Sequence, residues 1–355
     1  MFLATNELVK EKARFLLIMF VIVLIGYLTF FLTGLAYGLA TSYTQGIDKW
    51  KASGIILQND ANDNIARSLL LKSDYESVLD ENSALLGVGS ATIEQEDADD
   101  VSLFGIDMNS FVAPNITEGQ AVSGSDEVVV ADELQSAGIA LGQTIQLKGV
   151  TSDLKVVGFT DEATFQTAPI VYMQLDTWRV VASEVAGMTA MRDDTTVSAV
   201  VTKNPYSPSY DSGRMSWQTI RDYSFQLPGY SAQVLTFGLM IGFLTVIAAF
   251  VLAIFMYVLT LQKRAIFGIL KAEGIPSGYI ARSVMYQTLI ITVIGLGIGL
   301  AITLISGLLL GPKVPFLVSP IFFSAIILLY LLFAAIGGLA SVRAVTKIDP
   351  VEAIG

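Results

Sequence analysis

Four long apolar segments alternate with polar connections along the chain, and one connection is far longer than the others. Each segment exceeds the roughly 20 residues that an α-helix needs to cross a bilayer. We therefore predict membrane helices at residues 14–42, 232–262, 282–310 and 320–342. The first apolar run is much longer than the roughly 7–15 residues of a cleavable signal core, so we predict that it remains as a helix.

The long connection has the pattern of a folded domain. Short runs rich in β-branched residues are separated by glycine and polar turns, which is typical of strands. These runs are residues 127–130, 144–147, 154–159, 170–173 and 197–201. We interpret residues 132–138 as a short helix that stops at Gly138. The sequence thus predicts an α-helical membrane protein with an inserted α+β domain, mostly strand.

The predicted organisation has three parts. Residues 1–42 hold the N-terminus and the first helix, and residues 43–230 form the inserted domain. Residues 231–355 hold the other three helices and a C-terminal tail, with a short connecting segment at residues 263–282.

Charge is distributed unequally between these parts. The chain is 53% hydrophobic and only 15% charged, which is too apolar for an ordinary soluble protein. Residues 41–232 hold 11 basic and 27 acidic side chains, a net charge of −16, while the remainder holds 10 and 5, a net charge of +5. Basic side chains near helix ends favour the cytoplasmic side. Those near the helix ends are Lys10, Lys12, Arg14, Lys263, Arg264, Lys271, Arg282, Arg343 and Lys347.

In a four-helix topology all of these basic residues fall on one side of the membrane. We therefore predict that both termini are cytoplasmic and that the acidic inserted domain is extracytoplasmic.

The residue inventory excludes several kinds of chemistry. The chain has no cysteine and no histidine, so it lacks the commonest general base and transition-metal ligand. No P-loop, nucleophile elbow or His-Glu-x-x-His segment occurs. We interpret the acidic run 94–100 as a solvated loop and predict no catalytic residue, no metal site and no nucleic-acid partner. The predicted membrane helices hold essentially no charge, which argues against a self-powered carrier. Energy for transport would have to come from a partner.

The connection between the second and third helices has a pattern of its own. Residues 263–276 form an amphipathic stretch that ends at Gly274 and Pro276, which predicts a short, isolated helix. Such a helix could dock into a groove on a soluble partner. It could equally lie against lipid as an interfacial helix.

Glycines recur four residues apart in three of the predicted helices. This spacing allows close approach of helix backbones in a membrane, although glycine is common there in any case. The pairs are Gly34 with Gly38, Gly238 with Gly242, and Gly295 with Gly299. The first two pairs lie at a similar depth near the outer leaflet. They predict either tight packing of helices one and two or a flat slot between them.

Several motifs resemble those of the FtsX/MacB-type permeases of ABC transporters. One helix, a large outer domain and three more helices match that family's topology along the whole chain. The segment GILKAEGI at 268–275 is similar to its coupling motif, DPVEAI at 349–354 to its C-terminal motif, and residues 127–145 to a block of its outer domain. Ala265-Ile266-Phe267 departs from the family, which often has an acidic residue before this glycine.

The resemblance implies a homodimeric, multi-pass permease in a bacterial plasma membrane, bound to two copies of a separate cytoplasmic ATPase that binds ATP. It assigns the contact with that ATPase to Gly268, Leu270, Lys271, Glu273 and Gly274.

Three stretches, residues 17–40, 228–232 and 257–263, are similar to haem-exporting members of the family. Haem is a flat apolar ring with two carboxylates, and without histidine or cysteine its iron would need tyrosine, methionine or a carboxylate. Candidate residues near the outer leaflet are Tyr37, Tyr43, Tyr230 and Met240, with Phe237 as a wall for the ring. Tyrosines at this depth also serve as aromatic-belt anchors.

Two other functions fit the same resemblance. Some family members export or extract antimicrobial peptides, antibiotics or lipoproteins. FtsX-like members instead transmit a conformational signal to cell-wall hydrolases outside the cell.

Overall fold

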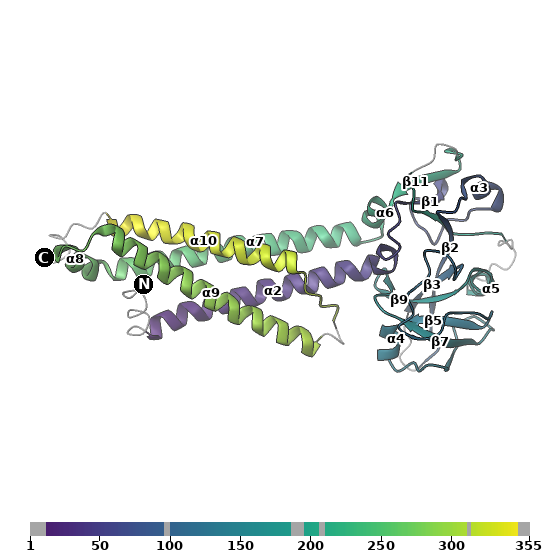
Figure 1. Ribbon diagram of the computed structural model, residues 1–355, viewed down its shortest axis with the longest axis horizontal. Helices are drawn as coiled ribbons and strands as arrows, with labels where there is room; N and C mark the ends of the chain where they lie inside the picture. The colour runs from purple at the N-terminus through teal and green to yellow at the C-terminus, as the bar shows by residue number, and fades with distance from the viewer. Residues whose placement is uncertain (1–11, 96–99, 186–194, 206–209, 311–313, 347–355) are drawn as a thin grey trace. The chain divides into compact units, whose positions relative to one another are not determined.

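Long apolar helices and a mixed sheet make up the protein (Figure 1). The computed structural model describes residues 12–95, 100–185, 195–205, 210–310 and 314–346. Within them, four helices are long and apolar enough to cross a membrane, as the hydrophobic pattern predicts. They are α2 (Lys12–Asp48), α7 (Tyr230–Gln262), α9 (Ser277–Leu310) and α10 (Pro320–Thr346). Residues Leu39–Gln233 form one compact unit, and the described residues on either side of it form the other.

All four helices extend beyond the apolar segments that predict them, and α2 and α9 do so most. Helix α2 continues six residues past residue 42 to Asp48, because Ile47, 1% exposed, packs in the core of the sheet unit. Helix α9 begins at Ser277 instead of residue 282, directly after Pro276. Its first turns are held by Ile280, which is fully buried. The length of an apolar run predicts only the part of a helix that can span the membrane. It does not predict helical residues that are stabilised by packing against other parts of the protein.

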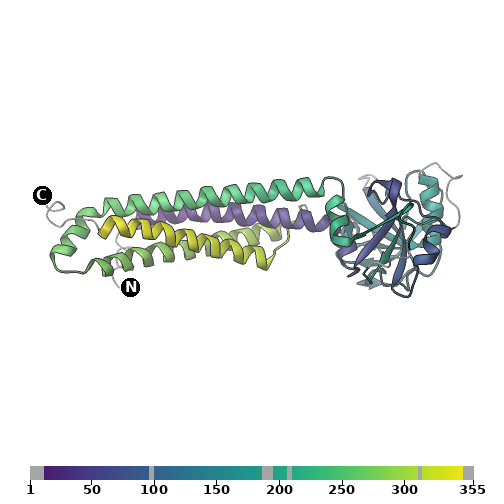
Figure 2. The same ribbon diagram turned by 90° about the horizontal axis from the view of Figure 1, so that it is seen from above.

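Small residues lie where the helices of the helical unit pack against one another. Figure 2 shows the course of these long helices. Gly295 and Gly299 of α9 lie against α2, where an added methyl group at Gly299 would be 2.9 Å from the backbone nitrogen of Tyr27. Such close approach is what the glycine spacing allows. Between α2 and α10, the hydroxyls of Thr29 and Tyr330 share a buried hydrogen bond of 2.8 Å.

The sheet unit is built on one mixed sheet. Its strand order is β11-β1-β10-β2-β3-β9-β5-β7-β4, with β6 paired to β7 and β8 to β9. Only β3 with β9 and β5 with β7 are parallel. The strands are β1 (Gly54–Gln58), β2 (Ser83–Thr92), β3 (Asp100–Ile106), β4 (Glu118–Gly119), β5 (Glu127–Ala131), β6 (Thr144–Ile145), β7 (Leu154–Thr160), β8 (Thr164–Phe165), β9 (Ala168–Gln174), β10 (Ala199–Thr202) and β11 (Met215–Thr219).

Short helices cover the sheet: α3 (Lys72–Tyr75), α4 (Asp132–Ser136), α5 (Leu175–Val185) and α6 (Ile220–Gln226). The prediction of an inserted α+β domain, mostly strand, is confirmed. The predicted strand runs correspond to β5, β6, β7, β9 and β10, and the predicted short helix corresponds to α4. The run at 144–147 is shorter than predicted, because β6 spans only Thr144–Ile145. The runs named in the sequence did not include β1, β2, β3 or β11.

Both faces of the sheet are buried. On β5, Val128 and Val130 belong to one core, while Val129 and Ala131 belong to the other. A continuous apolar run in place of alternation is what a strand covered on both faces shows. Trp178 of α5 is fully buried in the first core.

We expect Gly105→Ala to destabilise the sheet unit by about 3 kcal/mol, at the upper end for overpacking. Gly105 lies under Trp178, and an added methyl group would lie 3.0 Å from its Cδ2 and closer still to its Cβ. The matched control is Gly89→Ala, whose methyl group would meet its nearest neighbour, Trp178 Nε1, at 3.6 Å. Denaturant unfolding of the full-length chain, followed by tryptophan fluorescence, measures both. Equal midpoints for the two variants would contradict this packing.

Candidate functional site

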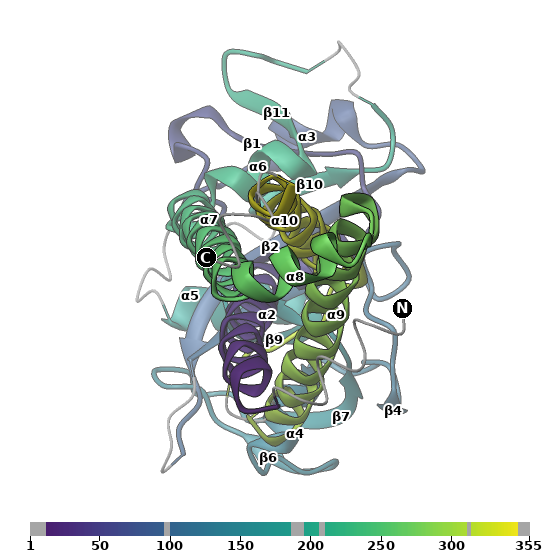
Figure 3. The ribbon, with the colours of Figure 1, turned by 90° about the vertical axis from the view of Figure 1, so that its left-hand side faces the viewer.

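The segment between α7 and α9 folds as helix α8 (Arg264–Ala272), confirming the predicted short helix. Gly274 ends it with φ = +88°, a left-handed conformation that glycine adopts without strain. The backbone N–H of Ile275 donates to the carbonyl of Leu270 at 3.0 Å, and Pro276 follows. In Figure 3, α8 lies across the ends of α7 and α9.

Helix α8 is fixed by its inner face. Phe267 is 1% exposed and packs with Ile280 and Val284 of α9, and Leu270 lies against the same cluster. Of the residues assigned to the ATPase contact, Gly268 is buried, Leu270 and Lys271 are half-buried, and Glu273 and Gly274 are exposed. The structure therefore places part of the predicted contact set on the inner side of the helix.

The outer face of α8 is apolar. Ile266 and Ile269 are 46% and 49% exposed, three residues apart on one side of the helix. The motif alone did not single out either residue. Their amphipathic spacing indicates a helix with an apolar face. Only the burial of Phe267 shows which apolar side chains pack against the rest of the chain and which remain exposed.

Lys263, directly before α8, is unusually buried for a lysine. It is 3% exposed, and its Nζ lies 4.9 Å from the centre of the Phe15 ring in α2. Burying an ammonium group is costly unless other groups stabilise it, and an aromatic face supplies part of that stabilisation. This contact joins the start of α8 directly to α2.

The two outer glycine pairs have different surroundings. Gly34 and Gly38 of α2 pack against residues 315–317, which precede α10. The backbone N–H of Leu317 donates to the carbonyl of Gly34 at 3.1 Å. Gly238 and Gly242 of α7 have open space within 4 Å of an added methyl group. Within one chain the two pairs do not face each other.

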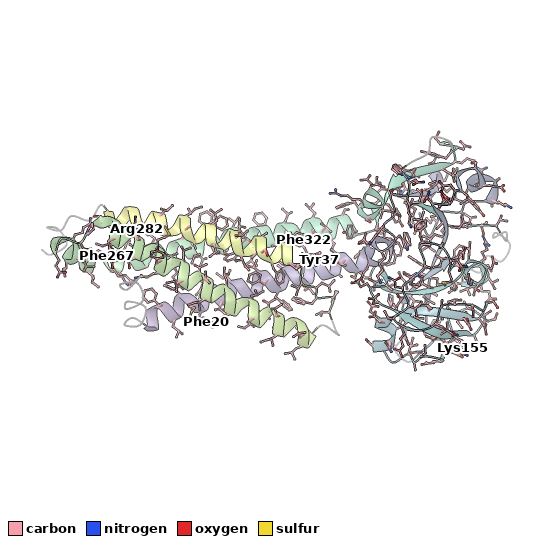
Figure 4. All side chains as sticks on the ribbon, in the orientation of Figure 1. Phe20, Tyr37, Lys155, Phe267, Arg282 and Phe322 are labelled. Atoms are coloured by element: carbon pink, nitrogen blue, oxygen red, sulfur yellow. The ribbon has the colours of Figure 1, made fainter. Side chains whose placement is uncertain are left out.

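The candidate ligand residues fall into separate groups. Tyr37 stacks edge-on against Phe322 of α10 at 5.6 Å, as Figure 4 shows. Tyr43 and Tyr230 meet in the sheet unit, with ring centres 5.5 Å apart. Phe237 is half-buried on α7, and Met240 is 47% exposed there. The structure thus brings only Tyr43 and Tyr230 together.

Helices α2 and α7 line a small apolar cavity. It encloses about 10 Å³ and is lined from α2 by Ile18 to Ile25 and from α7 by Ala248 to Phe255, with Tyr330 beside them. That is room for about one water, whereas ligand pockets measure about 300 Å³ or more. A flat ligand could enter there only if the helices separated.

A larger pocket lies where α2 ends and α6 begins, and we call it the α2–α6 pocket. It encloses about 290 Å³. Its lining comprises Thr44, Ile47, Asp48, Lys51, Ala52, Ile220, Arg221, Ser224, Phe225 and Tyr230. Tyr230 is therefore at its wall, while Lys51 and Arg221 are charged groups that the sequence motifs did not single out.

The inserted domain also contains a carboxyl with a shifted pKa. Desolvation and the neighbouring Asp132 together raise the pKa of Glu133 to about 7, and the charge of Lys49 opposes the change. Because the folded pKa exceeds the ordinary value of 4.5, folding favours the protonated form, so stability falls as pH rises from about 4.5 to 7. Glu133 keeps contact with solvent, which limits the size of the effect.

We expect Glu133→Gln to remove this part of the pH dependence. The measurement is the thermal midpoint of the full chain at several pH values between 4.5 and 7.5. The difference between wild type and variant should change across that interval, with the wild type losing stability relative to the variant. A constant difference would contradict the assignment.

Among the described residues, no group of three or more acidic side chains is placed to hold a metal ion. The C-terminal motif at 349–354 lies outside the described residues.

Four membrane-length helices, an inserted sheet domain and a short amphipathic helix between the second and third of these helices make up the described chain. Residues 238–350 match the family described as FtsX-like permease C-terminal. Over these residues the chain is similar to FtsX-like permeases.

The similarity of the chain to two curated relatives extends over its whole length. The chain is 26% identical over 356 residues to the hemin transport system permease protein HrtB of Staphylococcus haemolyticus, covering 99% of both chains. It is 26% identical over 362 residues to the protein of the same name in Staphylococcus epidermidis, again covering 99% of both. Among solved structures, the extracellular domain of the noncanonic ABC-type transporter YknZ matches 43% of this chain and 84% of its own, with 13% identity and a TM-score of 0.30.

Proposed function

We propose that this chain is the permease subunit of a pump that exports haem from the membrane or cytoplasm and thereby relieves haem toxicity. The observation that carries the proposal is the end-to-end similarity to two permeases named for hemin transport. Because the likeness covers both the membrane helices and the inserted domain, it includes every region where a ligand could bind. The absence of histidine and cysteine leaves tyrosine, methionine or carboxylates for the iron.

The motor in this proposal is a separate, HrtA-like ATPase in two copies on the cytoplasmic side. The outer face of α8, with Ile266 and Ile269, is the docking surface, since Phe267 already anchors the opposite face. Orientation follows the basic residues, which place α8 and both termini in the cytoplasm. Closure of the ATPase would push on α8, and the contact of Lys263 with Phe15 passes that movement to α2.

The functional unit in this proposal is a homodimer. Of the four membrane-length helices, α7 is the least covered by other parts of the chain. In its most apolar stretch 18% of the residues are buried, compared with 33–39% in the other three helices. Its open face holds Gly238 and Gly242 together with Leu239, Met240 and Phe243. A second copy packed on this face would complete a slot near Met240 that one chain does not enclose.

The direct test is a hemin titration of the purified full-length protein. We expect a shifted Soret band and saturation, with Tyr230→Phe altering the band if that tyrosine coordinates the iron. The spectrum of hemin in empty detergent micelles is the control. A titration indistinguishable from empty micelles would overturn the proposal.

A further inference from the structure

The α2–α6 pocket has the dimensions of a binding site and lies at a significant place in the chain. Its lining residues come from the last turn of α2 and the segment after it, from α6, and from the first residue of α7. Helices α2 and α7 are two of the membrane-length helices. The pocket lining includes residues at one end of each of these two helices.

Two cations, Lys51 and Arg221, line the pocket. Among the described residues, neither Lys51 nor Arg221 forms an ion pair within 4.0 Å. The single acidic group in the lining, Asp48, accepts a hydrogen bond from the Thr44 hydroxyl at 2.7 Å. The lining therefore has a net charge of +1, with two donors available to an anion.

The backbone at Lys51 is strained in a way that favours a role for its side chain. Its φ is +50°, in the left-handed region that follows a helix end and that glycine or asparagine adopts most easily. A lysine there is less stable than either, and such residues gather at functional sites.

The rest of the pocket suits a flat apolar group. Phe225 is 44% exposed and packs edge-on against Tyr230 at 5.7 Å, and Tyr230 packs against Tyr43 at 5.5 Å. Ile47 and Ile220 supply an apolar floor. A lining that combines two cations with two aromatic rings suits a molecule with an apolar body and an anionic group.

We propose that the α2–α6 pocket binds the anionic end of a membrane amphiphile, with Arg221 and Lys51 holding the charge and Phe225 and Tyr230 contacting the apolar body. Arginine binds carboxylates and phosphates in a planar, two-point manner, and lysine adds a point charge. Haem, through its two carboxylates, and an anionic phospholipid, through its phosphate, share this chemistry. The interpretation that the ligand is haem rests on the proposed function, whereas the interpretation that it is a phospholipid does not.

The test separates charge recognition from iron coordination by using an iron-free probe. Full-length protein in phosphatidylcholine nanodiscs is titrated with protoporphyrin IX and with its dimethyl ester, and binding is followed by porphyrin fluorescence. We expect the diacid to bind at least about tenfold more tightly than the ester, since one charge-assisted hydrogen bond corresponds to about a tenfold change in affinity. A second arm adds phosphatidylglycerol to the nanodiscs.

The variants are Lys51→Asn and Arg221→Gln. Asparagine tolerates the left-handed backbone, so Lys51→Asn removes the charge without adding strain. Each variant should weaken binding of the diacid about tenfold and leave the ester unchanged. The matched controls are Lys148→Asn and Arg67→Gln, which change exposed cations outside the pocket. Unfolding midpoints of all variants verify that they fold.

If both pocket variants lose binding of the diacid but keep binding of the ester, the pocket recognises the carboxylates. If phosphatidylglycerol competes with the diacid in the wild type but not in Lys51→Asn, the phospholipid reading holds, whatever the fate of haem export. Equal binding of diacid and ester together with no effect of phosphatidylglycerol overturns the proposal. Wild-type diacid affinity in both pocket variants also overturns it, even if hemin is bound and exported.

Discussion

Replacing Gly38 with alanine is expected to prevent the helical unit from folding stably. A methyl group at this position would overlap the carbonyl of Pro315 and lie 2.9 Å from the backbone nitrogen of Leu317. Both neighbours are backbone atoms, so no side chain can rotate to make room. The connection before α10 would have to move away from α2, which would also break the hydrogen bond from Leu317 to Gly34. We expect a loss of about 3 kcal/mol or more.

The matched control is Gly297→Ala in α9, where an added methyl group has open space within 4 Å. Alanine is the better helix former by about 1 kcal/mol in soluble helices, so this variant should be neutral or more stable. The measurement is the thermal midpoint of the detergent-solubilised protein, together with its level in membranes. A Gly38→Ala protein as stable as the Gly297→Ala protein would show that residues 315–317 do not pack on α2.

A second variant, Ile266→Asp with Ile269→Asp, should abolish assembly with the ATPase while leaving the permease folded. The two side chains form the exposed apolar face of α8, and central apolar anchors in an interface commonly contribute about 2 kcal/mol each. Losing both corresponds to roughly a thousandfold weaker binding. Phe267 still packs on Ile280 and Val284, so α8 itself should stay in place.

Assembly is measured by co-purification of the two subunits and by the transport activity of the complex. The conservative pair Ile266→Leu with Ile269→Leu retains the apolar face and should assemble. If the variant with both aspartates assembled normally with the ATPase, the docking surface would have to lie on another part of the chain. A fall in membrane level would instead point to disturbed insertion, which is why the level is measured in parallel.

The membrane helices were predictable because one property, apolar length, dominates their folding. The exceptions are informative. Residues 43–48 of α2 are helical because Ile47 is buried against the sheet unit, and that partner is distant in sequence. The strands named from the sequence were β-branched runs such as Val128–Val130. Strand β2 was missed, since Gly87 and Gly89 weaken the pattern, and of these Gly87 makes room for Trp178.

The candidate site was predictable in part. The glycine spacing indicates a helix surface suited to close contact, but it does not name the partner, and Gly34 and Gly38 meet residues 315–317 in this chain. The coupling motif located α8, yet only three-dimensional packing separates its buried Phe267 from its exposed Ile266. Lys51 and Arg221 are far apart in sequence, and each is unremarkable until α2 and α6 bring them to one pocket.

Transport of hemin by the assembled pump tests the central claim most directly. The permease and its ATPase are reconstituted into proteoliposomes that enclose an apoprotein acceptor, and transfer of externally supplied hemin to the enclosed acceptor is followed by absorbance after ATP is added outside. We predict ATP-dependent transfer that disappears in the Ile266→Asp, Ile269→Asp variant. ATP hydrolysis by an intact complex without any transfer of hemin would contradict the account.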